Sequence, residues 1–255
     1  MFTTNPFLEL SGVISPLAMQ LYVIAMVILV AGGTILDTLH KKSAQYFFEN
    51  SEKQKKMSSR EVSGGEKVGI AVKTVAVDVL TSAEFCNQKR RVAHLLTMYG
   101  FILFVVSTAV MIFGYADSAN AAAWPLLWHL GALMVCVGGY WFWFAIRVDV
   151  AAEGNPWYRV VKADLFILAL LATTTLALLW SVFGTIFFFV LFIAAATVLF
   201  GTVFWSKFAH MFFKPAAAYQ RRVSEADGSR QNLPPPADKP ARFGLGIKRE
   251  APRHY

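Results

Sequence analysis

The sequence predicts an all-α integral membrane protein, a bundle of five transmembrane helices with its N-terminus outside and its C-terminus in the cytoplasm. The first reason is composition: 56% of the 255 residues are hydrophobic, and a soluble domain of this size is rarely so apolar. The second is the distribution of charge, because all 24 Lys and Arg residues lie in 41–91, 147–162 and 207–253. The stretches between these segments are long, apolar and free of Lys and Arg.

A helix that crosses the hydrocarbon core of a bilayer needs about 20 apolar residues. Five segments meet this requirement, namely 17–38, 93–115, 124–146, 163–183 and 185–206. Gly32 and Gly33 in the first segment predict a close-packing spot for another helix. The last two segments are joined only by Phe183-Gly184-Thr185, which predicts a tight helical hairpin. Because the N-terminus has no basic region or cleavage motif, we expect the first span to be retained.

The positive-inside rule places all three basic segments in the cytoplasm, and with five spans it places the N-terminus outside. Tryptophans near the span ends predict aromatic belts at the two membrane surfaces. The expected outer belt is Trp124, Trp128 and Trp180, and the expected inner belt is Trp141, Trp143, Trp157 and Trp205. Since the outer loops are short, any large partner must dock from the cytoplasm.

This topology divides the chain into four parts. They are the N-terminus with the first span (1–40), a basic cytoplasmic loop (41–92), a four-span core (93–214) and a basic, largely disordered cytoplasmic tail (215–255). Within the loop, valines 68, 72, 75 and 79 recur at helical spacing. This pattern predicts an amphipathic helix on the membrane surface or against a partner, although its β-branched content leaves a strand open.

Composition also excludes several functions. No basic stripe with interleaved aromatics stands on a soluble element, so nucleic-acid binding is not expected. The net charge of +8 fits either anionic lipid headgroups or an acidic protein partner. The two cysteines, Cys86 and Cys136, do not form a cluster that could hold iron and sulfur. No nucleophile arrangement or carboxylate pair stands out, so the chain alone is a poor enzyme and a better electron conduit or anchor. A small transporter is disfavoured because the spans lack paired charges at mid-depth.

Two histidines are expected at the same depth, about one turn from the cytoplasmic boundary. His94 follows Lys89-Arg90-Arg91 at the start of the second span, and His210 follows the fifth span. Two facing imidazoles can provide both axial ligands of a b-type haem. The flanking cations that could meet the haem propionates are Arg90, Arg91, Lys207 and Lys214. The alternative is that both histidines are interfacial and bind nothing.

His129 lies near the outer face, so it cannot pair with the inner histidines. It could contact a quinone headgroup or release protons, or it could be a buried histidine bonded to a neighbouring hydroxyl. Lys162 and Asp164 open the fourth span, and Arg147 and Asp149 close the third. Local pairing at the boundary explains these four, and a quinone site that uses Lys162 and Asp164 is the alternative.

Three strings carry a family resemblance: Asp78-Val79-Leu80, Arg90-Arg91-Val92-Ala93-His94-Leu95-Leu96, and Ser206-Lys207-Phe208-Ala209-His210-Met211-Phe212-Phe213-Lys214-Pro215. Over roughly 68–222 the chain resembles the cytochrome b subunits of respiratory nitrate reductases and the related membrane subunits of quinone-interacting and heterodisulfide-reductase-like complexes. That family typically carries two haems, each held by one histidine from the second span and one from the fifth. Phe104 and Phe192 stand near the places of the outer histidine pair. The resemblance therefore implies one haem b, between His94 and His210.

Within this group the string from Lys207 to Arg222 looks most like the membrane anchors of dissimilatory adenylylsulfate reductases. That resemblance implies a multi-pass protein of the bacterial inner membrane. It also implies a soluble flavin and iron–sulfur partner, the alpha and beta subunits of the reductase, that oxidises sulfite with AMP. The anchor would pass the electrons to quinone. The alternative is a cofactor-free anchor that recruits a soluble oxidoreductase to the lipid surface.

Overall fold

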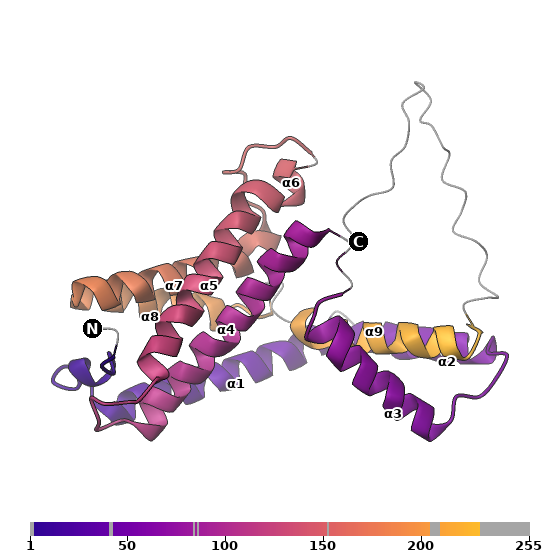
Figure 1. The fold of residues 1–255 in the computed structure, drawn as a ribbon, viewed down its shortest axis with the longest axis horizontal. Coiled ribbons are helices and arrows are strands. Elements are labelled where there is room, and N and C mark those ends of the chain that lie inside the picture. Colours follow the sequence, from indigo (N-terminus) through magenta and orange to yellow (C-terminus); the bar gives the residue numbers. More distant parts are fainter. Residues whose placement is uncertain are drawn as a thin grey trace. The chain divides into compact units, whose positions relative to one another are not determined.

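The structure is a computed structural model, and it describes residues 3–40, 43–83, 85, 87–151, 153–204 and 210–229. Every regular element among these residues is a helix, which confirms the expected all-α fold. Figure 1 shows the helices and their order along the chain. Two compact units are distinguished: Met1–Asp37 with Val92–Ala209, and Thr38–Arg91 with His210–Tyr255.

The first unit holds the long apolar helices. Four helical segments are long and apolar enough to cross a membrane: Pro16–His40 (α1), Gln88–Gly114 (α4), Trp124–Ile146 and Lys162–Phe183. The third consists of α5 (Trp124–Trp141) and the π-helix η3 (Phe142–Ile146), and the fourth of the 3₁₀ turn η4 (Lys162–Asp164) and α7 (Leu165–Phe183). These helices indicate a multi-pass membrane protein. A short helix, α6 (Val148–Ala151), follows η3.

The expected fifth span is shorter than predicted. Its helix, α8 (Ile186–Gly201), has 16 residues, which at 1.5 Å per residue is below the length that usually spans a bilayer. Residues 202–204 form a turn, and the end of the predicted span lies outside the described residues. The count of five spans and their orientation therefore stay predictions. The hairpin between α7 and α8 is confirmed, since Gly184 adopts the left-handed conformation (φ +63°) and donates its N–H to the Trp180 carbonyl at 2.8 Å.

Glycines bring the backbones of α4 and α5 almost into contact. A Cβ added to Gly100 would lie 2.7 Å from the Gly131 carbonyl oxygen, and one added to Gly131 would lie 2.6 Å from the Phe104 nitrogen. Gly138 repeats this contact 2.7 Å from the Ala93 carbonyl oxygen. Such contacts between small residues are typical of helices in lipid, because the hydrophobic effect does not drive helices together there and close packing must do so.

On α1 the predicted close-packing spot is half correct. A Cβ on Gly33 would lie 2.9 Å from the Val203 Cβ, so Gly33 does pack closely. A Cβ on Gly32 would meet no atom within 4 Å. Hydropathy shows that both glycines lie in a span, but only the direction of each residue around the helix axis decides which one faces a neighbour.

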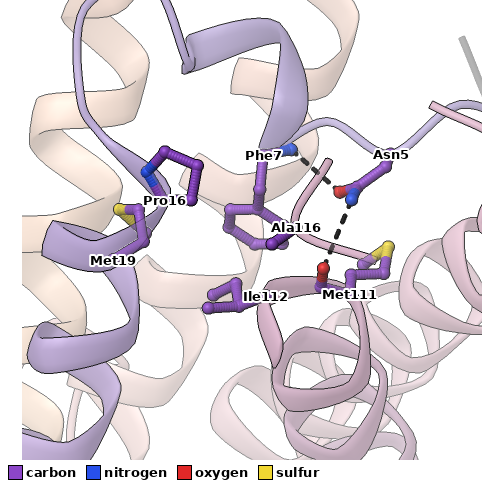
Figure 2. Close-up of a pocket in the computed structure, with 7 residues that line it drawn as sticks. All are labelled: Asn5, Phe7, Pro16, Met19, Met111, Ile112 and Ala116. Atoms are coloured by element: carbon purple, nitrogen blue, oxygen red, sulfur yellow. Dashed lines mark hydrogen bonds between the residues drawn. The ribbon is translucent and has the colours of Figure 1, made fainter. Parts of the chain in front are cut away.

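The segment before α1 folds over one end of the bundle and contains a short 3₁₀ turn, η1 (Leu8–Leu10). Asn5 donates through Nδ2 to the carbonyl oxygens of Tyr115 (2.9 Å) and Met111 (3.3 Å), at the end of α4. Figure 2 shows the bond to Met111. These bonds satisfy carbonyls that the end of a helix leaves unpaired. Asn5 and Phe7 line a small cavity with Met111 and residues of α1 and α4, and its volume of about 10 Å³ is near the size of one water molecule.

The second unit contains α2 (Ser43–Lys56), α3 (Gly64–Lys73), the π-helix η2 (Thr74–Val79) and α9 (His210–Ala226). The helix predicted from the valine spacing is confirmed, and Ser63 caps its start by accepting the Glu66 N–H at 3.3 Å. Arg60 donates through Nε to the Ala226 carbonyl at 2.6 Å, at the end of α9. The helix α9 continues to Ala226, so the first part of the segment predicted as the tail is helical; residues 230–255 lie outside the described residues.

Replacing Gly131 with alanine should destabilise the bundle, because the new Cβ would meet backbone atoms of α4 that cannot move aside. We expect a loss of about 1–3 kcal/mol in unfolding free energy, measured by thermal unfolding of the detergent-solubilised protein. Gly32→Ala is the matched control, since it adds the same methyl group to a span glycine with open space around it. Equal effects of the two substitutions would contradict the close packing of α4 and α5.

Candidate functional site

The two expected haem ligands belong to different compact units. His94 is half-buried in the second turn of α4, within the first unit. His210 is the first residue of α9 in the second unit, and its side chain lies outside the described residues. Their pairing therefore stays a prediction.

Two of the cations expected at the propionates have protein partners. Arg91 donates through Nε to the Thr81 carbonyl oxygen at 2.7 Å. The ammonium of Lys214 lies 5.1 Å from the centre of the Phe85 ring, a cation–π contact. Arg90 is half-buried in the first turn of α4, and Lys207 lies outside the described residues.

An aromatic cluster, here called the aromatic plug, fills the end of the bundle beneath the N-terminal segment. Its members are Phe7, Phe104, Trp128, Trp180, Phe189 and Phe192, all buried. Trp128 stacks on Phe104 at a centroid distance of 5.2 Å, and Trp180 stacks on Phe192 at 5.9 Å. Phe7 from the N-terminal segment completes the plug, 5.4 Å from Trp180. The expectation that Trp128 and Trp180 belong to the outer aromatic belt is therefore wrong, because both are core residues.

The plug decides whether a second haem could fit in this half of the bundle. Phe104 and Phe192, which the resemblance would put near an outer histidine pair, contact each other edge to face at 6.3 Å. The cavities that border the plug measure about 10 and 20 Å³, whereas cofactor pockets are on the order of 300–1,000 Å³. A haem does not fit between these side chains. For the inner position, the described residues offer a half-buried imidazole, His94, which is a suitable haem ligand.

His129 is buried beside the plug and both of its ring nitrogens have partners. Nδ1 lies 2.6 Å from the Pro125 carbonyl oxygen, and Nε2 lies 2.6 Å from the Ser181 hydroxyl. Because a carbonyl oxygen can only accept, Nδ1 donates its proton to Pro125, and Nε2 accepts from Ser181. This is the buried histidine with a hydroxyl partner that the sequence offered as an alternative. A quinone headgroup at His129 would have to displace one of these bonds.

Asp164 forms a buried ion pair with Arg147 at the ends of two spans. Arg147 donates through Nη1 to Asp164 Oδ2 at 2.8 Å, and the two side chains are 5% and 12% exposed. The guanidinium also lies 4.0 Å from the centre of the Trp143 ring and donates to the Arg159 carbonyl. These contacts place Asp164 in the structural pairing expected at this boundary. Lys162 is exposed, and the Asp149 side chain lies outside the described residues.

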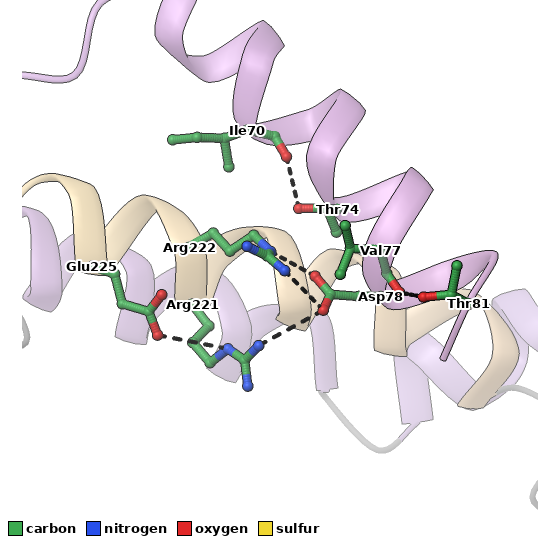
Figure 3. A network of polar contacts seen from close by, with 8 residues as sticks. All are labelled: Ile70, Thr74, Val77, Asp78, Thr81, Arg221, Arg222 and Glu225. Atoms are coloured by element: carbon green, nitrogen blue, oxygen red, sulfur yellow. Dashed lines mark hydrogen bonds and ion pairs between the residues drawn. The ribbon is translucent and has the colours of Figure 1, made fainter. Parts of the chain in front are cut away.

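A second buried carboxylate, Asp78, was not recognised as a functional group from the sequence. Only 8% of this residue is exposed, and it accepts hydrogen bonds from Arg222 Nε at 2.6 Å and Nη2 at 3.0 Å (Figure 3). Arg221 lies 3.9 Å from the same carboxylate. The hydrogen bonds from Arg222 hold the pKa of Asp78 below its usual value, against the opposing effect of burial. The pair joins η2 to α9.

The signal for this pair was present in the strings that carry the family resemblance. Asp78 opens one string, and Arg222 closes the string that begins at Lys207. A lone acid within the valine-rich segment 68–80 needs a cationic partner if its side of the helix is buried. The sequence therefore indicates that Asp78 needs a cationic partner. It does not identify Arg222 as that partner, because 144 residues separate the two.

Comparisons with protein-family models, characterised proteins and solved structures find no match to this chain. The family, its partner enzyme and its cofactor therefore stay predictions. Within the described part of the chain, no three His, Cys, Asp or Glu side chains converge as they would around a metal ion. That leaves a haem site untested, because haem iron needs only two axial ligands from the protein.

Replacing Asp78 with asparagine should lower the unfolding free energy at neutral pH by about 1.5–3 kcal/mol, because it removes charge-assisted hydrogen bonds from a buried site. Since the folded-state pKa of Asp78 is lowered, its contribution is complete above the unfolded pKa of about 3.9 and disappears as the pH falls through the folded value. The difference between wild type and variant should therefore shrink at acid pH, as measured by unfolding between pH 7 and 3.

Glu66→Gln is the matched control for this experiment. Glu66 also pairs with an arginine, Arg60, but both side chains are well exposed, so we expect a smaller effect. An Asp78→Asn variant as stable as the wild type at pH 7 would show that the pair does not hold the second unit together.

Proposed function

We propose that the chain is the membrane subunit of a redox complex and passes electrons between a cytoplasmic oxidoreductase and the quinone pool. One b-type haem, held by His94 and His210, would carry the electrons. The observation that carries this proposal is the division of the chain into an apolar unit of potential spans and a separate helical unit with exposed lysines at the end of α2. An electron carrier between a soluble enzyme and a lipid-soluble quinone needs both parts.

Several features of the chain support a single haem at the inner position. His94 sits on α4 just beyond the basic run Lys89-Arg90-Arg91, where propionates could reach cations while the iron stays among apolar side chains. The aromatic plug fills the other half of the bundle, and its side chains leave no space between them for the second haem that the resembled family carries. When bound, the haem would supply one-electron transfer, and the residues of this chain would set its orientation and exclude water.

The partner we propose is an adenylylsulfate reductase, a flavin and iron–sulfur enzyme that acts on sulfite and AMP. This choice rests on the resemblance of the string from Lys207 to Arg222 to the anchors of such enzymes. The second unit supports docking by a soluble protein, because it is built from packed helices. Lys53, Lys55 and Lys56 in the last turn of α2 would suit an acidic partner.

The second candidate is an anchor without a cofactor. It is favoured by the fact that several polar groups have structural partners: Arg91 is bonded to Thr81, Lys214 packs on Phe85, and Arg147 pairs with Asp164. For these three cations no ligand is needed to explain their position. An anchor would need only the spans and the docking surface.

Spectroscopy of the purified full-length chain separates the two candidates. We expect a reduced-minus-oxidised spectrum of a b-type haem and, by pyridine haemochrome, one haem per chain. His94→Ala and His210→Ala should each abolish the haem, because a six-coordinate site loses an axial ligand. His40→Ala, at the exposed end of α1, is the control that should keep it. A well-folded chain without haem would leave the anchor candidate, and haem retained in both variants would contradict the proposed ligands.

A further inference from the structure

The amphipathic helix of the second unit has its apolar side on the outside. Val68, Val72 and Val75 on α3 and η2 are 65%, 64% and 52% exposed. Thr74 and Asp78, which lie on another side of the same helix, are buried, and Asp78 is bonded to α9 (Figure 3). A soluble unit normally buries the apolar side of such a helix and exposes the polar side. The exposed valines, here called the valine stripe, therefore need another explanation.

The surroundings of the valine stripe are open, and both acids of its helix are paired with arginines. A Cβ added to Gly65 or Gly69, on the same helix, would meet no atom within 4 Å, so no described residue covers the helix at these two positions. The two acids of the helix, Glu66 and Asp78, are each bonded to an arginine. The cations at its flanks, Lys67 and Lys73, are exposed. The helix thus presents an apolar surface with a positively charged border.

The chain ties the valine stripe to the end of a potential span. Residues 80–87 separate η2 from α4 and can extend no more than about 28 Å. Arg91, in the first turn of α4, holds this connection by donating to the Thr81 carbonyl at 2.7 Å. Because this connection is short, the helix can contact the surface of a membrane that α4 crosses. Its apolar side and basic border suit such a contact.

We propose that the valine stripe lies in the membrane interface, with its valines at the boundary of the acyl chains and Lys67 and Lys73 against anionic lipid headgroups. This arrangement is typical of amphipathic helices that lie flat on a bilayer. It also gives Asp78 and Arg222 a further role, because their bond fixes the rotation of the helix and so directs the valines outward. The proposal does not depend on the haem.

The test uses full-length protein in nanodiscs of phosphatidylcholine and phosphatidylglycerol. Single cysteines at Val68, Val72 and, as a control on α2, Lys53 carry an environment-sensitive fluorophore, in a background with Cys86→Ser and Cys136→Ser. We expect quenchers attached to lipid to reach labels 68 and 72, and aqueous iodide to reach label 53. Labels 68 and 72 quenched by iodide and not by lipid would overturn the proposal. Protection of labels 68 and 72 from iodide that depends on protein concentration would also overturn the proposal, since it would indicate that a second copy of the chain covers the valine stripe.

The basic border is tested with Lys67→Gln and Lys73→Gln. Each lysine near an anionic surface contributes about a fivefold preference for the bound state, so each substitution should reduce the ratio of lipid-exposed to water-exposed label by about that factor. The effect should vanish in nanodiscs of phosphatidylcholine alone or at high salt. A stripe that stays in lipid equally well without either lysine would remove the headgroup part of the proposal.

Discussion

The cost of placing a charged side chain in hydrocarbon is the constraint on which the rest of this molecule depends. A lysine or arginine at the centre of a span costs about 2.5–3.5 kcal/mol on insertion scales. All 24 such residues are confined to three segments between the apolar stretches. At the end of one span Arg147 is paired with Asp164 and also contacts the Trp143 ring. The same constraint separates an apolar helical unit from a basic one.

Within the apolar unit, shape replaces the hydrophobic effect as the source of specificity. Lipid tails are as apolar as the helices, so close contact and buried hydrogen bonds must select the native packing. Gly100 and Gly131 let the backbones of α4 and α5 approach closely. At one end of the bundle the aromatic plug fills the space between the helices. His129 ties α5 to α7 through Ser181 in the same region. The aromatic plug leaves no haem-sized space in this part of the bundle.

The second unit differs from the apolar unit in that polar contacts hold its helices together. Asp78 with Arg222 joins η2 to α9, and Arg60 closes the end of α9 by bonding the Ala226 carbonyl. The apolar residues of α3 are left on the outside as the valine stripe. An ordered unit with a polar interior and an apolar, basic surface is suited to contacts with lipid and with another protein.

Hydropathy and charge predicted the helical class, four of the potential spans within a few residues, and the hairpin at Gly184. They do not predict which side of a helix faces the protein, so the outer aromatic belt predicted from the sequence includes Trp128 and Trp180, which are core residues. Pairs such as Asp78 with Arg222 were missed because a pattern along the chain holds no information about partners 144 residues away. The haem ligands stay predictions because His94 and His210 belong to separate units.

The most direct test of this account is the side of the membrane on which each basic segment lies. Single cysteines at Lys56, Glu153 and Glu225, and at Asp117 in the loop between α4 and α5, would be labelled with a membrane-impermeant maleimide in right-side-out and inside-out vesicles. The account predicts that the first three are labelled only in inside-out vesicles and Asp117 only in right-side-out vesicles. Labelling of Lys56 and Glu153 from opposite sides would contradict the topology and, with it, the common cytoplasmic face on which the haem proposal depends.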